Sequence, residues 1–349
     1  MFLDLHRHLE GSHSARALAL VARELDIRKP PFFNAEQRRF LTEAELAPRL
    51  GMPGPSDDAA VFYRCIELAR AAYVSEEAIG RLAFEAFMDA ASETDGLEMR
   101  VSLFSMTRTL LGSAWRQVGE DAFARRADRV LRRVLVARDQ AQARARKPML
   151  VRVGFSRTFE SASHTRAMAD VLRSHAAALC GLDVLGILPL AADKEPLQPA
   201  LVTILQSLRN VLPDLTIHAG EFEDHRSVER ALALEPHGIG HGVHSVGSSA
   251  VMQTLSARKV TLEVCPSSNA LLIPTALHRL REAHGGAHPL RVLQRHNVRA
   301  VLGSDDPVPM NTSFTSEIGA AALLGVDLQV LERDMLARWQ QITGRTLGR

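Results

Sequence analysis

Two histidines, His6 and His8, stand one residue apart in the stretch LDLHRHLEGS near the start of the sequence. Side chains alternate between the two faces of a β-strand, so both imidazoles would point the same way. Buried side by side, they would leave ring nitrogens that need partners. An isolated H-x-H pair is usually two surface histidines near a strand end. The alternative is a pair of metal ligands, which requires further ligands elsewhere in the chain.

Three later fragments carry residue types that could complete such a site. IHAGE holds His218 and Glu221, IGHGVH holds His241, and GSDDP holds Asp305 and Asp306. Each fragment alone is a weak signal, because a single histidine at a strand end and an Asp-Asp-Pro turn are both common. Adjacent carboxylates and clustered imidazoles repel or go unsatisfied unless a cation joins them. Their joint occurrence at one rim of a fold would therefore predict a metal site.

Three histidines and one carboxylate suit Zn²⁺ or a similar divalent ion. Water bound to such an ion loses its proton near neutral pH and becomes a nucleophile. His241 could orient that water and accept its proton. Glu221, three residues after a candidate ligand, could protonate the substrate, and Asp306 could accept a hydrogen bond from it. This set of residues indicates hydrolysis assisted by a metal ion.

The elements that must position these residues are eight short apolar segments rich in β-forming residues, with helical patterns between them. Alternating strands and helices in this number predict a parallel (β/α)8 barrel, the TIM-barrel fold of the α/β class. In such a barrel, polar residues at the carboxyl ends of the strands gather at one rim. We expect a single domain over residues 1–349. The expected strands cover residues 3–8, 97–103, 149–155, 183–190, 214–219, 238–242, 260–265 and 298–303.

Residues 9–96, between the first and second expected strands, are too many for a single crossover. They contain a Pro/Gly-rich part, with KPPFF and GMPGPSDD, and a helical stretch at 57–92. We expect an extra helical, lid-like insertion at about 28–92, at the rim where the βα loops build the active site. Its aromatic side chains either form an apolar lid or, as we expect for most of them, pack the inserted helices together. They are Phe32, Phe33, Phe62 and Tyr63.

The bulk composition argues against several classes of function. The 349 residues carry 42 Lys and Arg against 40 Asp and Glu, so the overall charge indicates neither nucleic acid nor membrane as a partner. The arginine-rich stretch 124–147 is typical of the exposed face of an outer barrel helix. No apolar run is long enough to span a bilayer, no signal peptide precedes the first strand, and the three cysteines form no C-x-x-C pair. We expect a cytoplasmic protein, and the sequence does not indicate its oligomeric state.

The chain resembles the adenosine deaminase family of the amidohydrolase superfamily. The matching motifs are LHRHLEGS, LEMRVS, IHAGE, IGHGVH, VCPSSN and GSDDP, in the order typical of the family and spread from residue 5 to residue 307. The resemblance implies one zinc ion, or another divalent metal, per chain, held by His6, His8, His218 and Asp305. It also implies a small-molecule purine substrate that loses its 6-amino group as ammonia by hydrolysis.

The same resemblance implies roles for three further residues. Glu221 would protonate the purine ring nitrogen next to the reacting carbon. His241 would orient the attacking hydroxide. Asp306 would form a hydrogen bond with the five-membered ring of the purine.

Departures from the family pattern concern the substrate. Glu10 stands where adenosine-specific members usually have the Asp of H-L-D-G, which contacts the ribose. Ala192, in PLAADKE, stands at a Gly position whose backbone N–H reaches the purine in many members, and its methyl group would crowd that approach. In contrast, IGHG resembles the nucleoside deaminases more than the free-base enzymes. We therefore expect adenosine or a related 6-aminopurine nucleoside, with adenine, N6-substituted adenines and aminodeoxyfutalosine-type compounds as alternatives.

Two other interpretations stay open at this point. One is a two-metal hydrolase of cyclic amides or esters, which would use Lys194 as a carbamate; the position of this lysine beyond the expected strand and the presence of Glu221 argue against it. The other is a metal-stabilised binding module, disfavoured because a degenerate enzyme would have lost part of the set. Cys265 is expected to be a small buried hydrophobic residue. We expect a structural or substrate-edge role for Arg100.

Overall fold

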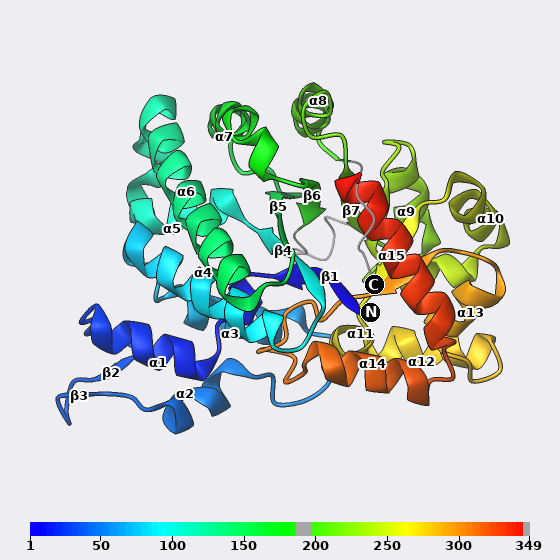
Figure 1. Ribbon diagram of the computed structural model, residues 1–349, viewed down its shortest axis with the longest axis horizontal. Coiled ribbons are helices and arrows are strands. Elements are labelled where there is room, and N and C mark those ends of the chain that lie inside the picture. Colours follow the sequence, from blue (N-terminus) through cyan, green and yellow to red (C-terminus); the bar gives the residue numbers. More distant parts are fainter. Residues whose placement is uncertain (186–196, 345–349) are drawn as a thin grey trace.

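The computed structural model describes residues 1–185 and 197–344, and its centre is an eight-stranded parallel sheet (Figure 1). The sheet order is β1, β4, β5, β6, β7, β8, β9 and β10, with each strand parallel to the next. The first strand meets the end of the last one, because the Asp305 N–H donates to the His6 carbonyl and the His8 N–H donates to the Asp305 carbonyl, both at 2.8 Å. The predicted (β/α)8 barrel is therefore confirmed. The strands are Leu3–His8 (β1), Gly96–Val101 (β4), Met149–Ser156 (β5), Gly181–Leu185 (β6), Leu215–Ala219 (β7), Gly238–His241 (β8), Thr261–Val264 (β9) and Ala300–Leu302 (β10).

Strand β1 illustrates how a barrel strand combines packing and chemistry. All six of its residues are buried, as expected for a parallel strand covered on both faces. Because side chains alternate, Leu3 and Leu5 face away from His6 and His8. The leucines belong to the continuous hydrophobic core, while the rings of His6 and His8 both lie next to His218 of β7.

Helices surround this barrel (Figure 1). Helix α6 buries Phe123, Val130 and Val134 in the core and pairs its exposed Arg132 with Asp128 across one helical turn at 2.8 Å. The arginine-rich stretch is therefore the exposed side of an outer barrel helix, as predicted. The helices are Ala15–Glu24 (α1), Glu43–Leu50 (α2), Ala59–Arg70 (α3), Glu76–Ala91 (α4), Leu103–Leu111 (α5), Glu120–Ala145 (α6), Ala162–Ser174 (α7), Pro199–Leu208 (α8), His225–Leu232 (α9), Ser249–Arg258 (α10), Pro266–Leu272 (α11), Pro274–Ala283 (α12), Pro289–Arg295 (α13), Phe314–Leu323 (α14) and Leu328–Thr343 (α15).

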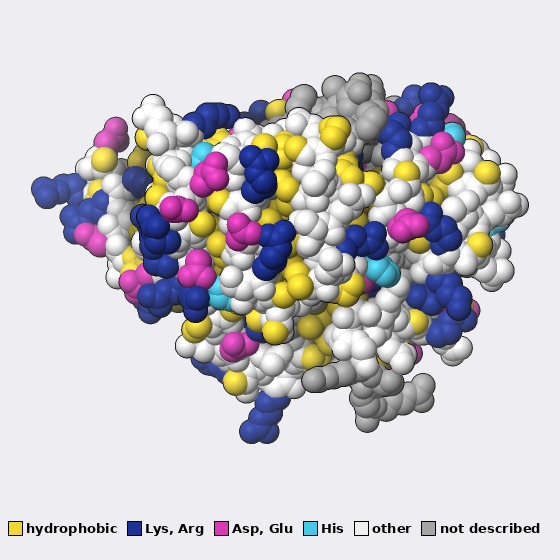
Figure 2. Space-filling view, turned by 90° about the horizontal axis from the view of Figure 1, so that it is seen from above, with side chains coloured by type: hydrophobic (Ala, Val, Ile, Leu, Met, Phe, Trp, Pro, Cys, Tyr) yellow, Lys and Arg dark blue, Asp and Glu magenta, His cyan; other side chains and the backbone are white. Residues whose placement is uncertain are grey.

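The surface seen in Figure 2 mixes Lys and Arg with Asp and Glu, and apolar side chains lie scattered between them. Among the described residues, no helix is long and apolar enough to cross a membrane.

The insertion between the first two barrel strands has a different layout from the predicted one. Helix α1 starts at Ala15, before the expected boundary, and the predicted helical stretch 57–92 is two helices, α3 and α4. Helix α4 packs against α6 as part of the outer layer, so only α3 lines the cavity described below. Phe32 is buried in the core, and Phe33 stacks edge-on against Phe40 between the short strands β2 (Phe33–Asn34) and β3 (Arg39–Phe40).

Charged side chains fill part of the barrel interior. They form a buried ion network that consists of Glu98, Arg100, Arg152, Asp183, Asp214, Glu263 and Arg338. Arg152 donates to Glu98 and Asp214, each at 2.7 Å, and Arg338 of α15 donates to Asp214 at 2.7 Å. Removing one member of such a network would leave a buried charge unpaired, at a cost of about 3–5 kcal/mol. Arg100 therefore has a structural position, below the rim rather than on it.

Candidate active site

The two histidines of β1 lie together at the carboxyl end of the barrel. Their Nε2 atoms are 3.3 Å apart. Asp305 approaches both from the end of β10, with its Oδ1 atom 3.7 Å from His6 Nε2 and 3.4 Å from His8 Nε2. The ring of His218, from β7, has its centroid 4.8 Å from that of His6. The structure thus gathers these four candidate ligands, and it buries all of them.

Two close approaches of the backbone make this convergence possible. A Cβ atom at Gly303 would lie 2.3 Å from the Cβ of His6, and a Cβ atom at Gly11 would lie 1.9 Å from Oδ1 of Asp306. Only glycine fits either position. His241 and Asp305 both have φ of +59°, a left-handed conformation that non-glycine residues seldom adopt. Such conformations cluster at functional sites, where the surrounding structure maintains them.

Buried carboxylates contact the Nδ1 atoms of His218 and His6. Nδ1 of His218 lies 3.2 Å from Oδ1 of Asp183, and Nδ1 of His6 lies 3.3 Å from Oε2 of Glu263. A carboxylate at Nδ1 leaves Nε2 as the nitrogen that could bind a metal, which is the usual arrangement around metal-binding histidines. Nη1 of Arg100 also lies 3.0 Å from Nε2 of His6. Sequence reasoning missed Asp183 and Glu263, although both are carboxylates inside otherwise apolar strands, which is the signal that could have found them.

Nδ1 of His241 lies 3.2 Å from the side-chain nitrogen of Asn269. This contact aims the Nε2 atom of His241 at the same space, 3.5 Å from Oε2 of Glu221. Asn269 of α11 is thus in contact with a candidate catalytic residue.

The protonation states fit a cation-binding centre. Burial, and then the nearby Arg100, hold the pKa of His6 well below its ordinary value, and burial together with His218 does the same for His8. Both imidazoles are therefore neutral, which is the form that binds metals. Neutral nitrogens facing one another, with a carboxylate beside them, are a donor set that suits a divalent cation.

Two further groups near these histidines have pKa values far from their ordinary ones. Burial lowers the pKa of His241 to about 3, so this ring is neutral near pH 7. Burial, and then the adjacent Asp305, raise the pKa of Asp306 well above its ordinary value. In its neutral form Asp306 can donate a hydrogen bond as well as accept one.

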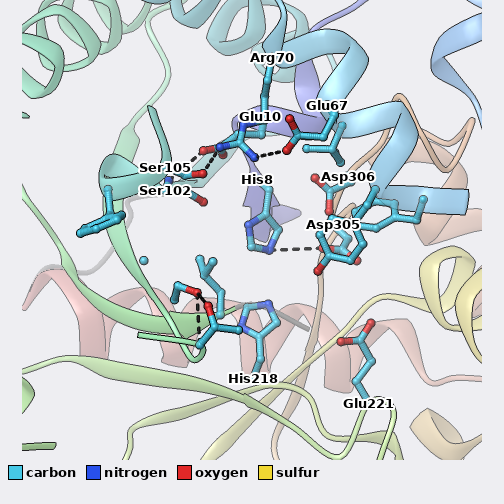
Figure 3. A pocket seen from close by; sticks show the side chains of 18 of the residues that line it. His8, Glu10, Glu67, Arg70, Ser102, Ser105, His218, Glu221, Asp305 and Asp306 are labelled. Atoms are coloured by element: carbon cyan, nitrogen blue, oxygen red, sulfur yellow. Dashed lines mark hydrogen bonds and ion pairs between the residues drawn. The ribbon is translucent and has the colours of Figure 1, made fainter. Parts of the chain in front are cut away.

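The site opens into a cavity of about 380 Å³ (Figure 3). We call one part of its lining the histidine end, which consists of His8, His218, Glu221, His241, Asp305 and Asp306. We call another part the arginine rim, which consists of Glu67, Arg70, Ser102, Ser105, Arg108 and Glu160. Glu10 lies between them, and its Oε1 atom accepts a hydrogen bond from the Ser102 N–H at 3.1 Å. Apolar side chains of α3, including Phe62 and Tyr63, complete the wall.

Sequence reasoning did not find the arginine rim. Glu67 and Arg70 are spaced like an ordinary surface ion pair on a helix, and nothing in that spacing shows which way α3 faces. Ala192 and Lys194, predicted as a substrate contact and as the carbamate of the two-metal alternative, lie outside the described residues.

Comparison with known proteins places this geometry in a family. The sequence profile of adenosine deaminase matches residues 2–336. The chain belongs to the adenosine deaminase family. Adenosine deaminase of Klebsiella pneumoniae (strain 342) is 28% identical over 324 residues, which cover 91% of this chain and 86% of that protein. Adenosine deaminase of Salmonella typhi is 26% identical over 322 residues, with the same coverage of each chain.

Solved structures show the same fold as this member of the adenosine deaminase family. Adenine deaminase from Arthrobacter aurescens superposes with a TM-score of 0.73 at 19% identity, covering 96% of this chain and 92% of its own. An amidohydrolase from Burkholderia ambifaria, with bound Zn, has a TM-score of 0.72 at 16% identity, covering 99% and 86%. N6-methyl-AMP deaminase from Arabidopsis thaliana has a TM-score of 0.66 at 17% identity, covering 96% and 90%. The family membership makes this chain a hydrolytic deaminase of the metal-dependent amidohydrolase type.

Proposed function

We propose that this deaminase hydrolyses the 6-amino group of a purine nucleoside, with adenosine as the first candidate, and that one zinc ion per chain serves the reaction. The observation that carries the proposal is that His6 and His8 form a buried cluster with His218 and also lie within 3.7 Å of Asp305. Glu221 and His241 lie beside them, 3.5 Å apart. The four residues would hold the ion. When bound, it would supply Lewis-acid activation of water near neutral pH.

The remaining residues of the histidine end would move protons and hold the purine. Neutral His241, held at Nδ1 by Asn269, would accept a proton from the attacking water. Glu221, 3.5 Å from that ring, would donate a proton to the purine nitrogen beside the reacting carbon. Asp306 would hydrogen-bond the five-membered ring. Overall, one water molecule is consumed, its oxygen replaces the amino group on the purine carbon, and ammonia leaves.

Glu10 favours a nucleoside over a free base. Its Oε2 atom is buried and has no hydrogen-bond partner among the described residues, although it lies in the cavity wall. A buried acceptor without a donor is costly, and a sugar hydroxyl would supply the donor. Free adenine would leave this atom unpaired. The curated relatives named adenosine deaminase support the same choice, while structural neighbours named adenine deaminase and N6-methyl-AMP deaminase keep adenine and N6-substituted adenines as alternatives, beside aminodeoxyfutalosine-type compounds.

The proposal is tested by measuring ammonia release together with metal content on the same sample. The panel contains adenosine, adenine, N6-methyladenosine and adenosines altered at the 5′ position. Turnover of a nucleoside with one zinc per chain is the expected result. Turnover of adenine alone would overturn the nucleoside assignment, and two metals per chain without any deamination would favour the two-metal amide hydrolase.

A further inference from the structure

The arginine rim contains a buried cation whose hydrogen bonds are incomplete. Arg70, the last residue of α3, is only 8% exposed. Its Nη1 donates to Oε1 of Glu67 at 2.7 Å, and its Nη2 donates to the hydroxyl of Ser105 on α5. Its Nε atom is buried and has no hydrogen-bond partner among the described residues. A charged donor in this state costs free energy until a ligand supplies an acceptor.

A second arginine lines the same cavity. Arg108 follows Ser105 by one turn of α5 and lines the same cavity. Its Nη1 lies 2.5 Å from Oε1 of Glu160. Oε2 of the same carboxylate lies 3.7 Å from Nη2 of the exposed Arg116. Arg70 of α3 and Arg108 and Ser105 of α5 therefore line the same cavity, and Figure 3 shows the guanidinium group of Arg70 next to Ser105.

The carboxylates that now neutralise these arginines lie near water. The Glu67 side chain is 63% exposed, and that of Glu160 is 24% exposed. Solvent screens the charge of Glu67, while Arg70 itself is buried and also interacts with the charge of Glu10. A substrate group that binds the guanidinium more completely can therefore displace Glu67 and Glu160.

We propose that the substrate carries an oxyanion, either a carboxylate or a phosphate, on its sugar side, and that Arg70 and Arg108 bind it. Planar guanidinium groups bind such anions through paired N–H donors, and the Ser105 hydroxyl adds a further donor. Glu10 repels an anion at its own position, so the anion must lie beyond the sugar, at the rim. This inference rests on the proposed function. The sugar of the substrate faces the arginine rim only if the 6-amino group of the purine lies at the histidine end.

The test compares ammonia release from adenosine, adenosine 5′-monophosphate and adenosine 5′-carboxylate by the zinc-loaded enzyme. We expect kcat/KM for at least one of the two anionic compounds to exceed that for adenosine by about tenfold or more, as charge-assisted hydrogen bonds allow. The better of the two identifies phosphate or carboxylate as the group recognised. A preference for adenosine over both anions would overturn the proposal.

Substitutions in the arginine rim test whether its residues cause the preference for anionic substrates. Arg70→Gln and Arg108→Gln should each bring the ratio of anionic to neutral kcat/KM close to one, and Arg70→Lys should retain part of it. The matched control is Arg64→Gln, because Arg64 lies exposed on the same helix. Equal losses on adenosine and on the anions in both Gln variants would contradict the proposal.

A second measurement separates this inference from the proposed function. If no compound releases ammonia, the deaminase assignment to purine nucleosides fails, and calorimetry with inosine and inosine 5′-monophosphate then tests the rim by itself. Tighter binding of the monophosphate by the wild type than by Arg70→Gln supports the rim. Equal binding of both compounds to both proteins overturns it.

Discussion

The histidine end and the arginine rim belong to one cavity, but they are built in different ways. At the histidine end, His8, His218, His241 and Asp305 lie at the ends of barrel strands, and buried polar groups hold two of the three imidazoles from behind. At the rim, Arg70 and Arg108 lie on α3 and α5, and their carboxylate partners reach the solvent. The barrel therefore fixes the atoms that need accurate placement, while the helices outside it carry the groups that we propose select a substrate.

Asp305→Ala should have the largest effect, because it removes the only carboxylate among the four proposed ligands. We expect the metal content to fall from one per chain to almost none and ammonia release to fall below detection. Metal analysis and activity on the same sample check this. Full metal occupancy with normal turnover would show that the histidine end does not depend on Asp305.

Glu221→Gln should leave the metal in place and lower kcat by roughly 10²–10⁴-fold, since general acid catalysis contributes that much. Steady-state kinetics with metal analysis measure both quantities. The control is Glu229→Gln, since Glu229 is exposed on α9. An unchanged kcat would remove Glu221 from the proposed mechanism.

Asp183→Asn tests the groups behind the ligands. His218 and Arg100 hold the pKa of Asp183 below its ordinary value against the effect of burial, so this carboxylate is charged when it contacts His218. Loss of the charge should lower metal affinity or activity by about 10–100-fold. Metal affinity is measured by titration of this variant. The control is Asp170→Asn, since Asp170 is exposed on α7. Equal affinities would mean that the strand ends alone position the ligand.

The free energy of unfolding should also depend on pH through His288, a residue outside the cavity. This effect must be distinguished from any effect of pH on the histidine end or the arginine rim. His288 is buried where α13 begins, its Nδ1 accepts the Leu290 N–H at 3.2 Å, and burial lowers its pKa to about 4. The unfolded chain binds the proton near pH 6.5, so stability is full above that pH and is lost as the pH falls toward 4. At pH 5 the loss should be about 2 kcal/mol.

Urea unfolding at pH 7.5 and pH 5 measures this loss. His288→Asn keeps a helix-capping side chain and should remove this share of the pH dependence. His296→Asn, at an exposed histidine that follows the same helix, should not. Identical pH dependence in wild type and His288→Asn would exclude His288 as the cause.

Glu10→Gln should have the smallest effect on catalysis. It makes the same Glu→Gln change as at Glu221 but in another part of the cavity, so the two variants can be compared directly. We expect KM for the nucleoside to rise about tenfold, as the loss of one charge-assisted hydrogen bond predicts, while kcat changes less than KM. Kinetics on adenosine check this split. A loss confined to kcat would place Glu10 with the catalytic residues instead.

The difference between the two parts of the cavity also decided what sequence could predict. Barrel strands alternate side chains with a fixed period, so His6 and His8 could be assigned to one face and the strand ends to one rim. The direction that α3 faces depends on the loop before it and on its packing, and no local period encodes that, so Arg70 was missed. The ion network was missed for a similar reason: its members come from separate strands and from α15, and the contacts that join them are set by barrel closure.

The position of Arg338 in that network has a consequence for biosynthesis. The residues it neutralises, Asp214 and Glu263, leave the ribosome long before Arg338 does, because Arg338 lies in α15, the last described helix. Until then the interior of a growing chain holds carboxylates that lack one of their cations. The ion network beneath the proposed metal ligands can therefore reach its final charge balance only after α15 has left the ribosome. A nascent chain that lacks α15 should be inactive even though its proposed catalytic residues have already been made.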